Sequence, residues 1–483
     1  MSREGGSSRG ARGAGGVAPA GAGDAAGRGD PAGDRIAETE PGERRVEPVE
    51  PAVPAVPAVP AVPAEPVEPA VPAVPAVPAV PVVPAVPAEP VVPAVPAVPA
   101  VPVEIDGSLG EGGGQILRTA LALAMITGRP LRMRRIRAGR ARPGLRRQHL
   151  ACVDAAARLS HAEVHGAHVG SQYLELWPRA ITGGELEIDI GSAGSTTLVV
   201  QTILVPAIAA GKTLRAVIRG GTHNPLAPPF EFLDRVYLPH LRAMGAQVSL
   251  SLDRHGFASG GRGKPERSER SERSERGERS GSGERGERSE RSGSGERGDG
   301  DGLGQLTLEI RAGSALRPIE IVEAGPITAR RATVILARLP THVAERELAI
   351  VKRTLGFSPR EVAVREVQAG GPGNVLLLEV ERAESRELVS SFGEKGVRAE
   401  LVAQRACDEL AAFLAADVPV GTHLADQLLL PLAVAGGGRF RAAALSSHAT
   451  TNIDTIRRFL DVQITVEPDP VTAAVTVAIG RPP

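Results

Sequence analysis

The residues most suited to chemistry lie near the C-terminal end of the chain, where one histidine, His448, stands within the hydroxyl-rich run SSHATTN. It follows an apolar strand candidate at residues 440–445. A neutral imidazole beside the amides of a helix start can act on phosphate groups. A lone histidine is more often a capping or core residue. We expect His448 in a polar loop, with Asn452 as the N-cap of a final helix over residues 453–460.

A glycine-rich turn, GEGGGQ at residues 110–115, offers backbone amides that could approach phosphate oxygens. It lacks the Gly-Lys-Ser/Thr of a P-loop and the spacing of a dinucleotide fingerprint. Glu111 within it would repel a phosphate unless a divalent cation lay between them. An ordinary surface glutamate is an equally good interpretation.

Eight arginines and no acidic residue lie between Arg132 and Arg147. Gly139, Pro143 and Gly144 give residues 136–149 the character of a shaped loop. Planar guanidinium groups bind phosphate in a bidentate manner. The loop is therefore a candidate phosphate site, with a nonspecific basic patch as the alternative.

The elements that must position these residues form a repeat. A strand over Val103–Asp106, a glycine-rich turn, an apolar helix over Gln115–Thr127 and a strand over residues 131–136 make the first unit. Residues 186–224 repeat the pattern, and residues 424–454 repeat it from the helix onward. We expect three copies of one β–turn–α–β unit.

The repeat brings particular polar positions into correspondence. Each unit can be aligned on its helix-ending glycine, namely Gly128, Gly211 and Gly437. Ten residues before these glycines stand Arg118, Gln201 and Gln427, and eleven residues after them stand Gly139, Thr222 and His448. A polar side chain within an apolar helix needs a partner, so we expect the helices to direct these groups at a shared cleft. The alternatives are coincidence and ordinary exposed helix positions.

The fold class expected is α/β (α+β). Residues 1–103 read as a disordered tail, because proline at every third position of their Val-Pro-Ala tract prevents helix and sheet pairing. Residues 104–316 form the first part of a core domain, with a solvated low-complexity loop of RSE and RGE units at 262–302. A smaller α/β domain at 317–416 is inserted before the last part of the core, 417–483.

The composition excludes several classes of protein. A formal net charge of zero argues against a polycation that coats nucleic acid. Cys152 and Cys407 are far apart and predict buried, reduced thiols. Because no apolar run has the ~20 residues of a membrane span and no signal peptide is evident, we expect a cytoplasmic protein without a membrane partner.

Several motifs, in this order, resemble the RNA 3′-terminal phosphate cyclase family. They are DGSLGEGGGQILR, IRAGRARPGLRRQHL, GSAGSTTLVVQT, GGTHNPLAPP, HVAERE, HLADQLLLPLAVAGGG and SSHATTNI. The resemblance covers residues 104–466 apart from the RSE loop. It implies a large domain of repeated units, akin to enolpyruvyl-transferase domains, with a smaller inserted domain.

The resemblance also implies a reaction and its residues. ATP adenylylates a histidine, AMP passes to the 3′-phosphate of RNA, and the 2′-OH closes a 2′,3′-cyclic phosphate. By motif position His448 is the nucleophile and Glu111 binds a divalent cation, Mg²⁺ or Mn²⁺. Phosphate handling falls to Arg118, Arg137, Arg140 and Gln148, and nucleotide binding to Gln201, Pro228, His423, Leu424, Ala425, Asp426 and Gln427. His423 stands where the family often has tyrosine. A non-catalytic relative acting in ribosomal RNA processing is the alternative function.

Overall fold

The computed structural model describes residues 101–110, 113–257, 303–313 and 315–482. The expected tail up to residue 100, Glu111 and the RSE loop lie outside the described residues. Among the described residues, no helix combines the length and apolar composition that a membrane crossing requires. Cys152 and Cys407 are buried and free, as expected.

The first repeat unit has six elements and one four-stranded sheet. Its sheet has the order β1-β2-β4-β3, in which β1 and β2 are parallel and the other neighbours antiparallel. The elements are β1 (Val103–Asp106), α1 (Gln115–Thr127), β2 (Leu131–Arg134), α2 (Arg147–Ser160), β3 (Glu163–His165) and β4 (Leu174–Trp177). The helix α1 ends where Gly128 adopts a left-handed conformation, φ 68°.

The second unit repeats this order of elements and this topology. Its sheet is β5-β6-β8-β7, again with a parallel first pair. The elements are β5 (Gly184–Asp189), α3 (Thr196–Ala209), β6 (Leu214–Gly220), the continuous helical segment α4 (Phe230–Phe232), η1 (Leu233–Tyr237) and α5 (Leu238–Ala243), β7 (Val248–Arg254) and β8 (Gly304–Ile310).

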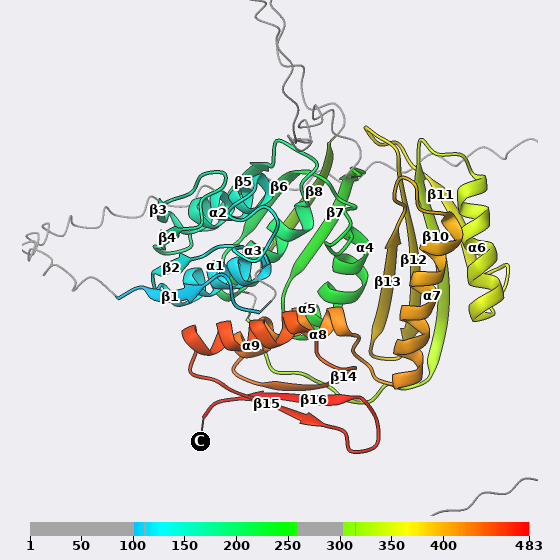
Figure 1. The fold of residues 1–483 in the computed structure, drawn as a ribbon. Coiled ribbons are helices and arrows are strands. Elements are labelled where there is room, and N and C mark those ends of the chain that lie inside the picture. The colour runs from blue at the N-terminus through cyan, green and yellow to red at the C-terminus, as the bar shows by residue number, and fades with distance from the viewer. Residues whose placement is uncertain (1–100, 111–112, 258–302, 314, 483) are drawn as a thin grey trace, which may run out of the picture. The chain divides into compact units, whose positions relative to one another are not determined.

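The third unit has the same sheet, β9-β14-β16-β15. Its elements are β9 (Glu320–Ile321), α8 (Thr422–Val434), β14 (Gly438–Ala442), α9 (Ser447–Phe459), β15 (Gln463–Pro468) and β16 (Val475–Gly480). The expected repeat of three β-α-β units is thus confirmed, and each described unit continues with a further helix and two strands. Helices from all three units pack together in one apolar core (Figure 1).

A further domain stands between β9 and α8. Its sheet has the order β11-β10-β12-β13, and α6 and α7 cover one face of it (Figure 1). The elements are β10 (Ile327–Ala337), α6 (His342–Leu355), β11 (Val362–Glu366), β12 (Gly373–Arg382), β13 (Arg386–Phe392) and α7 (Ala399–Ala416). Because β9 pairs with β14, the inserted segment begins after Ile321, later than the expected boundary at residue 317.

Two polar contacts illustrate how the inserted domain is joined to the core within the described part of the chain. Arg235 on η1 forms an ion pair with the largely buried Glu379 on β12. The backbone N–H of Gly421, the N-cap of α8, donates to Oε2 of Glu387 on β13 at 3.0 Å. The start of the helix that carries Asp426 and Gln427 is therefore fixed by the inserted domain.

Some expected boundaries were wrong. The helix α9 begins at Ser447, six residues earlier than predicted, because Ser446 is its N-cap and accepts a hydrogen bond from Ala449 N–H at 3.1 Å. Asn452 lies inside this helix and is not its cap. The strand β2 ends at Arg134, since Arg135 has a positive φ of 54°. The helix α8 is followed by left-handed Gly436, one residue before the expected Gly437.

Candidate active site

The three polar helix positions of the repeat meet in one pocket. Arg118 on α1, Gln201 on α3 and Gln427 on α8 all line it, together with Tyr237 and Asp426. The side-chain amide of Gln201 donates to Oε1 of Gln427 at 2.6 Å. The expectation that pseudo-equivalent helices direct polar groups at a shared cleft is confirmed for these three residues.

Asp426 connects this pocket to neighbouring helices. It is only 9% exposed, and its Oδ1 accepts from the side chain of Gln115 on α1 and from Nδ2 of Asn452 on α9 at 3.1 Å. Burial raises its pKa, although Gln115, His448 and Arg118 act in the opposite direction. Because this carboxylate accepts hydrogen bonds from two other helices, it fixes the positions of α1, α8 and α9 relative to one another.

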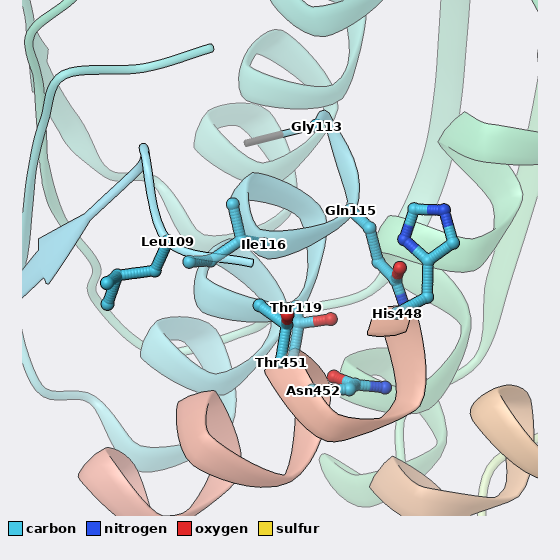
Figure 2. A pocket seen from close by; sticks show the side chains of 8 residues that line it. All are labelled: Leu109, Gly113, Gln115, Ile116, Thr119, His448, Thr451 and Asn452. Atoms are coloured by element: carbon cyan, nitrogen blue, oxygen red, sulfur yellow. The ribbon is translucent and has the colours of Figure 1, made fainter. Parts of the chain in front are cut away.

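His448 is the second residue of α9, so its ring lies in the first helical turn, where backbone amides are not used within the helix. The ring is half-buried and lines a pocket with Gly113, Gln115 and Asn452. Figure 2 shows it beside the Gln115 side chain, with Asn452 farther along α9. The expectation of a histidine in a loop was wrong, whereas its position at a helix start suits an anionic substrate.

Arg140 reaches the same place from the arginine loop. A Cβ atom placed on Gly113 would lie 3.3 Å from Nη2 of Arg140 and 4.0 Å from Cε1 of His448. A side chain at position 113 would therefore enter the space that the guanidinium and the imidazole border. This glycine leaves room for a ligand beside both groups.

Arg137 is held by its own loop, and both Arg137 and Arg118 are partly removed from water. Arg137 has a positive φ of 55°, and its Nη1 donates to the carbonyl oxygens of Arg142 at 2.9 Å and Gly144 at 3.0 Å. Burial and the charges of Arg140 and Arg146 lower its pKa. Burial also lowers the pKa of Arg118, against the attraction of Cys152 and Asp426. Cations that are partly desolvated and lie near one another favour an anionic ligand.

The family model of RNA 3′-terminal phosphate cyclases matches residues 109–466 of this chain. The RNA 3′-terminal phosphate cyclase of Ectopseudomonas mendocina is 46% identical over 365 residues, which cover 75% of this chain and 94% of that protein. The one of Koribacter versatilis is 39% identical, with 78% and 95% covered, and the one of Salmonella enteritidis is 39% identical, with 76% and 95% covered.

The chain belongs to the RNA 3′-terminal phosphate cyclase family. This membership confirms the resemblance and the expectation of an enzyme. The mixed α/β fold with its four-stranded sheets agrees with it.

Other residues that the cyclase-family motifs suggested lie outside the two pockets. Gln148 is the second residue of α2, the place that His448 takes in α9, and it packs on the turn at Gly194. The carbonyl of Pro228 accepts from Oγ1 of Thr197 on α3 at 2.8 Å, one helical turn before Gln201. Thr222, which the repeat aligned with His448, is buried and bonded to His223 and Gly256.

The suggested nucleotide residues at the start of α8 differ in exposure. His423 is exposed and forms an ion pair with Glu409 at 3.3 Å, which raises its pKa. Leu424 and Ala425 are fully buried, so their side chains belong to the core and not to the pocket. Among the described residues, no three His, Cys, Asp or Glu side chains are arranged to hold a metal ion. Glu111, the suggested metal ligand, lies outside them.

One buried residue of this cyclase-family site escaped sequence interpretation. His149 is 4% exposed, and its Nδ1 accepts from the backbone N–H of Arg146 at 3.0 Å. Burial, followed by the charges of Arg137, Arg118 and Arg146, lowers its pKa to about 3. The ring is therefore neutral with the proton on Nε2, which faces Gly114. The sequence signal that could have identified His149 is its position three residues after the N-cap of α2, the position whose side chain bonds the N-cap amide in a capping box.

Proposed function

We propose that this protein uses ATP to convert the 3′-terminal phosphate of RNA into a 2′,3′-cyclic phosphate, with His448 as the nucleophile. The observation that carries the proposal is the convergence of His448, Arg140 and the glycine turn next to the pocket of Arg118, Gln201 and Gln427. That arrangement offers a nucleophile, cations and amide groups in two pockets that share Gln115, Thr119 and Asn452.

In the first step, a ring nitrogen of His448 attacks the α-phosphorus of ATP and the bond to the β-phosphate breaks, releasing pyrophosphate. Arg140 and the amides at the start of α9 stabilise the charge on the transferred phosphoryl group. The amide side chains of Gln201 and Gln427, which bond to each other, line the space for the nucleoside. Asp426 holds Gln115 and Asn452 in place beside the ring.

In the second step, an oxygen of the RNA 3′-phosphate attacks the phosphorus of the histidine-bound AMP and frees the imidazole. In the third step, the adjacent 2′-OH loses its proton to solvent as its oxygen attacks the 3′-phosphorus of the RNA. The bond from that phosphorus to the oxygen of AMP breaks, and AMP leaves. Adenylylation is needed because a phosphate monoester has a poor leaving group. The 2′-OH that closes the ring is found in RNA and not in DNA, and it is already held next to the phosphorus.

A divalent cation would neutralise the phosphate charges of ATP. We assign its binding to Glu111 on the motif alone, and no step above depends on it. A reaction that consumes ATP and RNA takes place where both are found, so we propose a cytoplasmic location.

Incubation with ATP labelled at the α-phosphate tests the proposal. The protein should acquire one acid-labile AMP, which unlabelled RNA with a 3′-phosphate should discharge. His448→Ala and His448→Asn should not be labelled and should retain the thermal midpoint of the parent, because the ring is half-buried at a helix start and not in the core. Labelling of either variant would remove His448 from this role, and an unlabelled parent would refute the proposed reaction.

A further inference from the structure

The start of α1 lacks the side chains that usually satisfy a helix N-terminus. Its N-cap residue is Gly114, which provides no side-chain cap, and its first turn carries no acidic residue. The amide groups of a first helical turn have no acceptor within the helix and attract negative charge. By contrast, α2 is capped by Nδ1 of His149, which accepts from the N–H of Arg146, and α9 is capped by Ser446. The start of α1 therefore suits an anion, although a helix start alone does not make a site.

Two polar side chains border this helix start. A Cβ atom placed on Gly114 would lie 2.5 Å from Nε2 of His149 and 3.3 Å from Nη1 of Arg118. His149 is 4% exposed, and because its Nδ1 is an acceptor, its Nε2 carries the proton and is a donor. In the part of the chain that the structure describes, no residue accepts from this N–H, and none forms a hydrogen bond or ion pair with the Arg118 guanidinium. Since a buried donor without an acceptor is costly, both groups indicate a ligand that these residues do not supply.

The preceding residue of the same turn borders the proposed nucleophile. A Cβ atom on Gly113 would lie 3.3 Å from Nη2 of Arg140 and 4.0 Å from Cε1 of His448. Consecutive α-carbons are about 3.8 Å apart, so the donors beside Gly114 are one residue away from this pair. Donors at successive residues of one turn fit two linked phosphate groups, one beside the imidazole and one next to it.

The proposed reaction identifies the second phosphate group. The attacking and leaving atoms lie roughly in line on opposite sides of the phosphorus. When His448 attacks the α-phosphorus of ATP, the β-phosphate leaves on the far side, and the RNA 3′-phosphate that later displaces His448 must attack from that same side. We propose that His149, together with Arg118, binds the group on this side, which is the β-phosphate of ATP in the first step and the 3′-phosphate of RNA in the second. The inference rests on the proposed function and deepens it.

A neutral donor suits a position that two groups occupy in turn. Burial, followed by the charges of Arg137, Arg118 and Arg146, lowers the pKa of His149 to about 3. The ring therefore donates a hydrogen bond without adding a further positive charge, and a bond from a neutral donor is weaker than one from a cation. Pyrophosphate must leave before the RNA phosphate can enter, and a neutral imidazole retains it less than another cation would.

Two substitutions separate the cap of α2 from the proposed phosphate contact. In His149→Asn the side-chain oxygen takes the place of Nδ1 and keeps the cap, but no donor stands in the place of Nε2. In His149→Gln the side-chain oxygen can accept from Arg146, as in a capping box, while the amide nitrogen still donates. His161→Asn, at the exposed C-cap of the same helix, is the matched control, because asparagine tolerates the left-handed backbone there.

Discharge of the AMP-labelled protein in single turnovers measures both uses of the position. After labelling to completion and removal of ATP, the protein is mixed with inorganic pyrophosphate, which re-forms ATP, or with 3′-phosphorylated RNA, which takes the AMP. His149→Asn should slow both reactions about 10- to 100-fold, as the loss of a hydrogen bond to a charged group does, with the thermal midpoint of the parent. His149→Gln and His161→Asn should react at parental rates.

Parental rates of His149→Asn with both reagents overturn the inference and leave His149 as the cap of α2 alone. A loss with only one of them overturns the shared position. If His149→Asn does not fold, His149→Glu replaces it, since glutamate keeps the cap and the shape of glutamine without the donor; equal rates of the Glu and Gln variants then overturn the inference. If the parent is not labelled by ATP at all, the proposed function fails; if it is labelled and the His149 variants discharge normally, only the phosphate position fails.

Discussion

At the scale of single residues, the arginine-rich segment is not a uniform basic patch. On the sheet of the first unit, Arg132 pairs with Glu104 and Glu175, and Arg134 lies 3.7 Å from Glu104. These side chains are neutralised by acidic residues of neighbouring strands. Beyond the strand, Arg140 lies beside Gly113 near His448, and Arg137 lies near Arg140. The change occurs after Arg135, which lies just beyond the end of β2 and still forms an ion pair with Asp106.

Replacing Arg140 by lysine tests whether the arginines of the loop differ in function from those that are paired on the sheet. Lysine keeps the charge but loses the planar fork that holds two oxygens, so the rate of AMP transfer should fall about 10- to 100-fold, as expected for a charge-assisted hydrogen bond. Arg134→Lys, on the strand, is the matched control and should retain activity. We prefer Arg140 to Arg137 as the probe, because Arg137 also bonds the backbone of its own loop. Equal losses at positions 140 and 134 would make the loop a generic basic surface.

A buried carboxyl in the inserted domain should make the stability depend on pH in the mildly acidic range. Glu347 on α6 is fully buried, and burial raises its pKa to about 7 in spite of a 2.8 Å hydrogen bond from Asn374. Its Oε2 and Oδ1 of Asn374 have no partner among the described residues. Because the folded state holds this proton more tightly than the unfolded state, stability falls as pH rises from about 4.5 to 7 and then levels off.

Glu347→Gln removes this titration and should therefore be more stable than the parent above pH 7, by on the order of 2 kcal/mol. The gain should shrink toward zero near pH 4.5, where the parent carboxyl is protonated. The free energy of unfolding in urea, measured for both proteins at pH 5 and pH 8, gives the small gain and the full gain. Glu345→Gln, at an exposed position of the same helix, should show no such dependence. A variant that is less stable at both values would show that the carboxylate is needed.

At the scale of the elements, the start of α9 determines where His448 lies. The side chain of Ser446 satisfies the N–H of Ala449, and the same first turn carries the imidazole. A shift of this turn would move His448 relative to Gly113 and Arg140.

Ser446→Ala should therefore lower stability by about 1 kcal/mol, the usual effect of a lost N-cap, and should slow AMP transfer as well. Ser446→Asp restores a side-chain acceptor and should recover the thermal midpoint. Thermal unfolding and labelling by ATP are measured on the same samples. A stable Ser446→Ala protein with a normal rate would mean that the helix start is held by its packing against α1 and not by the cap.

The elements that the sequence predicted well are those whose apolar pattern is strong. The helix α1 begins and ends at the expected residues, and the polar positions Arg118, Gln201 and Gln427 meet as the repeat suggested. The start of α9 was missed because serine and threonine have weak helix propensity and favour caps and turns. The short strands β3 and β4 were missed because polar residues interrupt them. Gln115 and Asn452 were missed as site residues because only tertiary structure brings them to Asp426.

At the scale of the whole molecule, we predict that two long segments can be removed without loss of the proposed reaction. The strands β7 and β8 pair directly, with Leu252 opposite Leu306, although the low-complexity loop lies between them in sequence. Deleting residues 1–102 and replacing 262–301 by a few glycines should leave the thermal midpoint and the rate of AMP transfer nearly unchanged, because neither segment has apolar residues in a pattern that forms a core. A large drop in either quantity would assign a working role to one segment.

The position of β9 has a consequence for the order of folding. Glu320 on β9 lies beside Arg439 on β14, 119 residues later in the chain. Pairing that spans a whole domain is slow, because a long loop must close before the contact forms. We expect the first and second units, whose strands are joined by shorter connections, to form first, and the third unit, which carries Asp426, Gln427 and His448, to close last. Pulsed hydrogen exchange should then show protection of α1 and α3 before α8 and α9. If this order holds, a chain that has not finished folding lacks the residues that we propose bind the nucleotide.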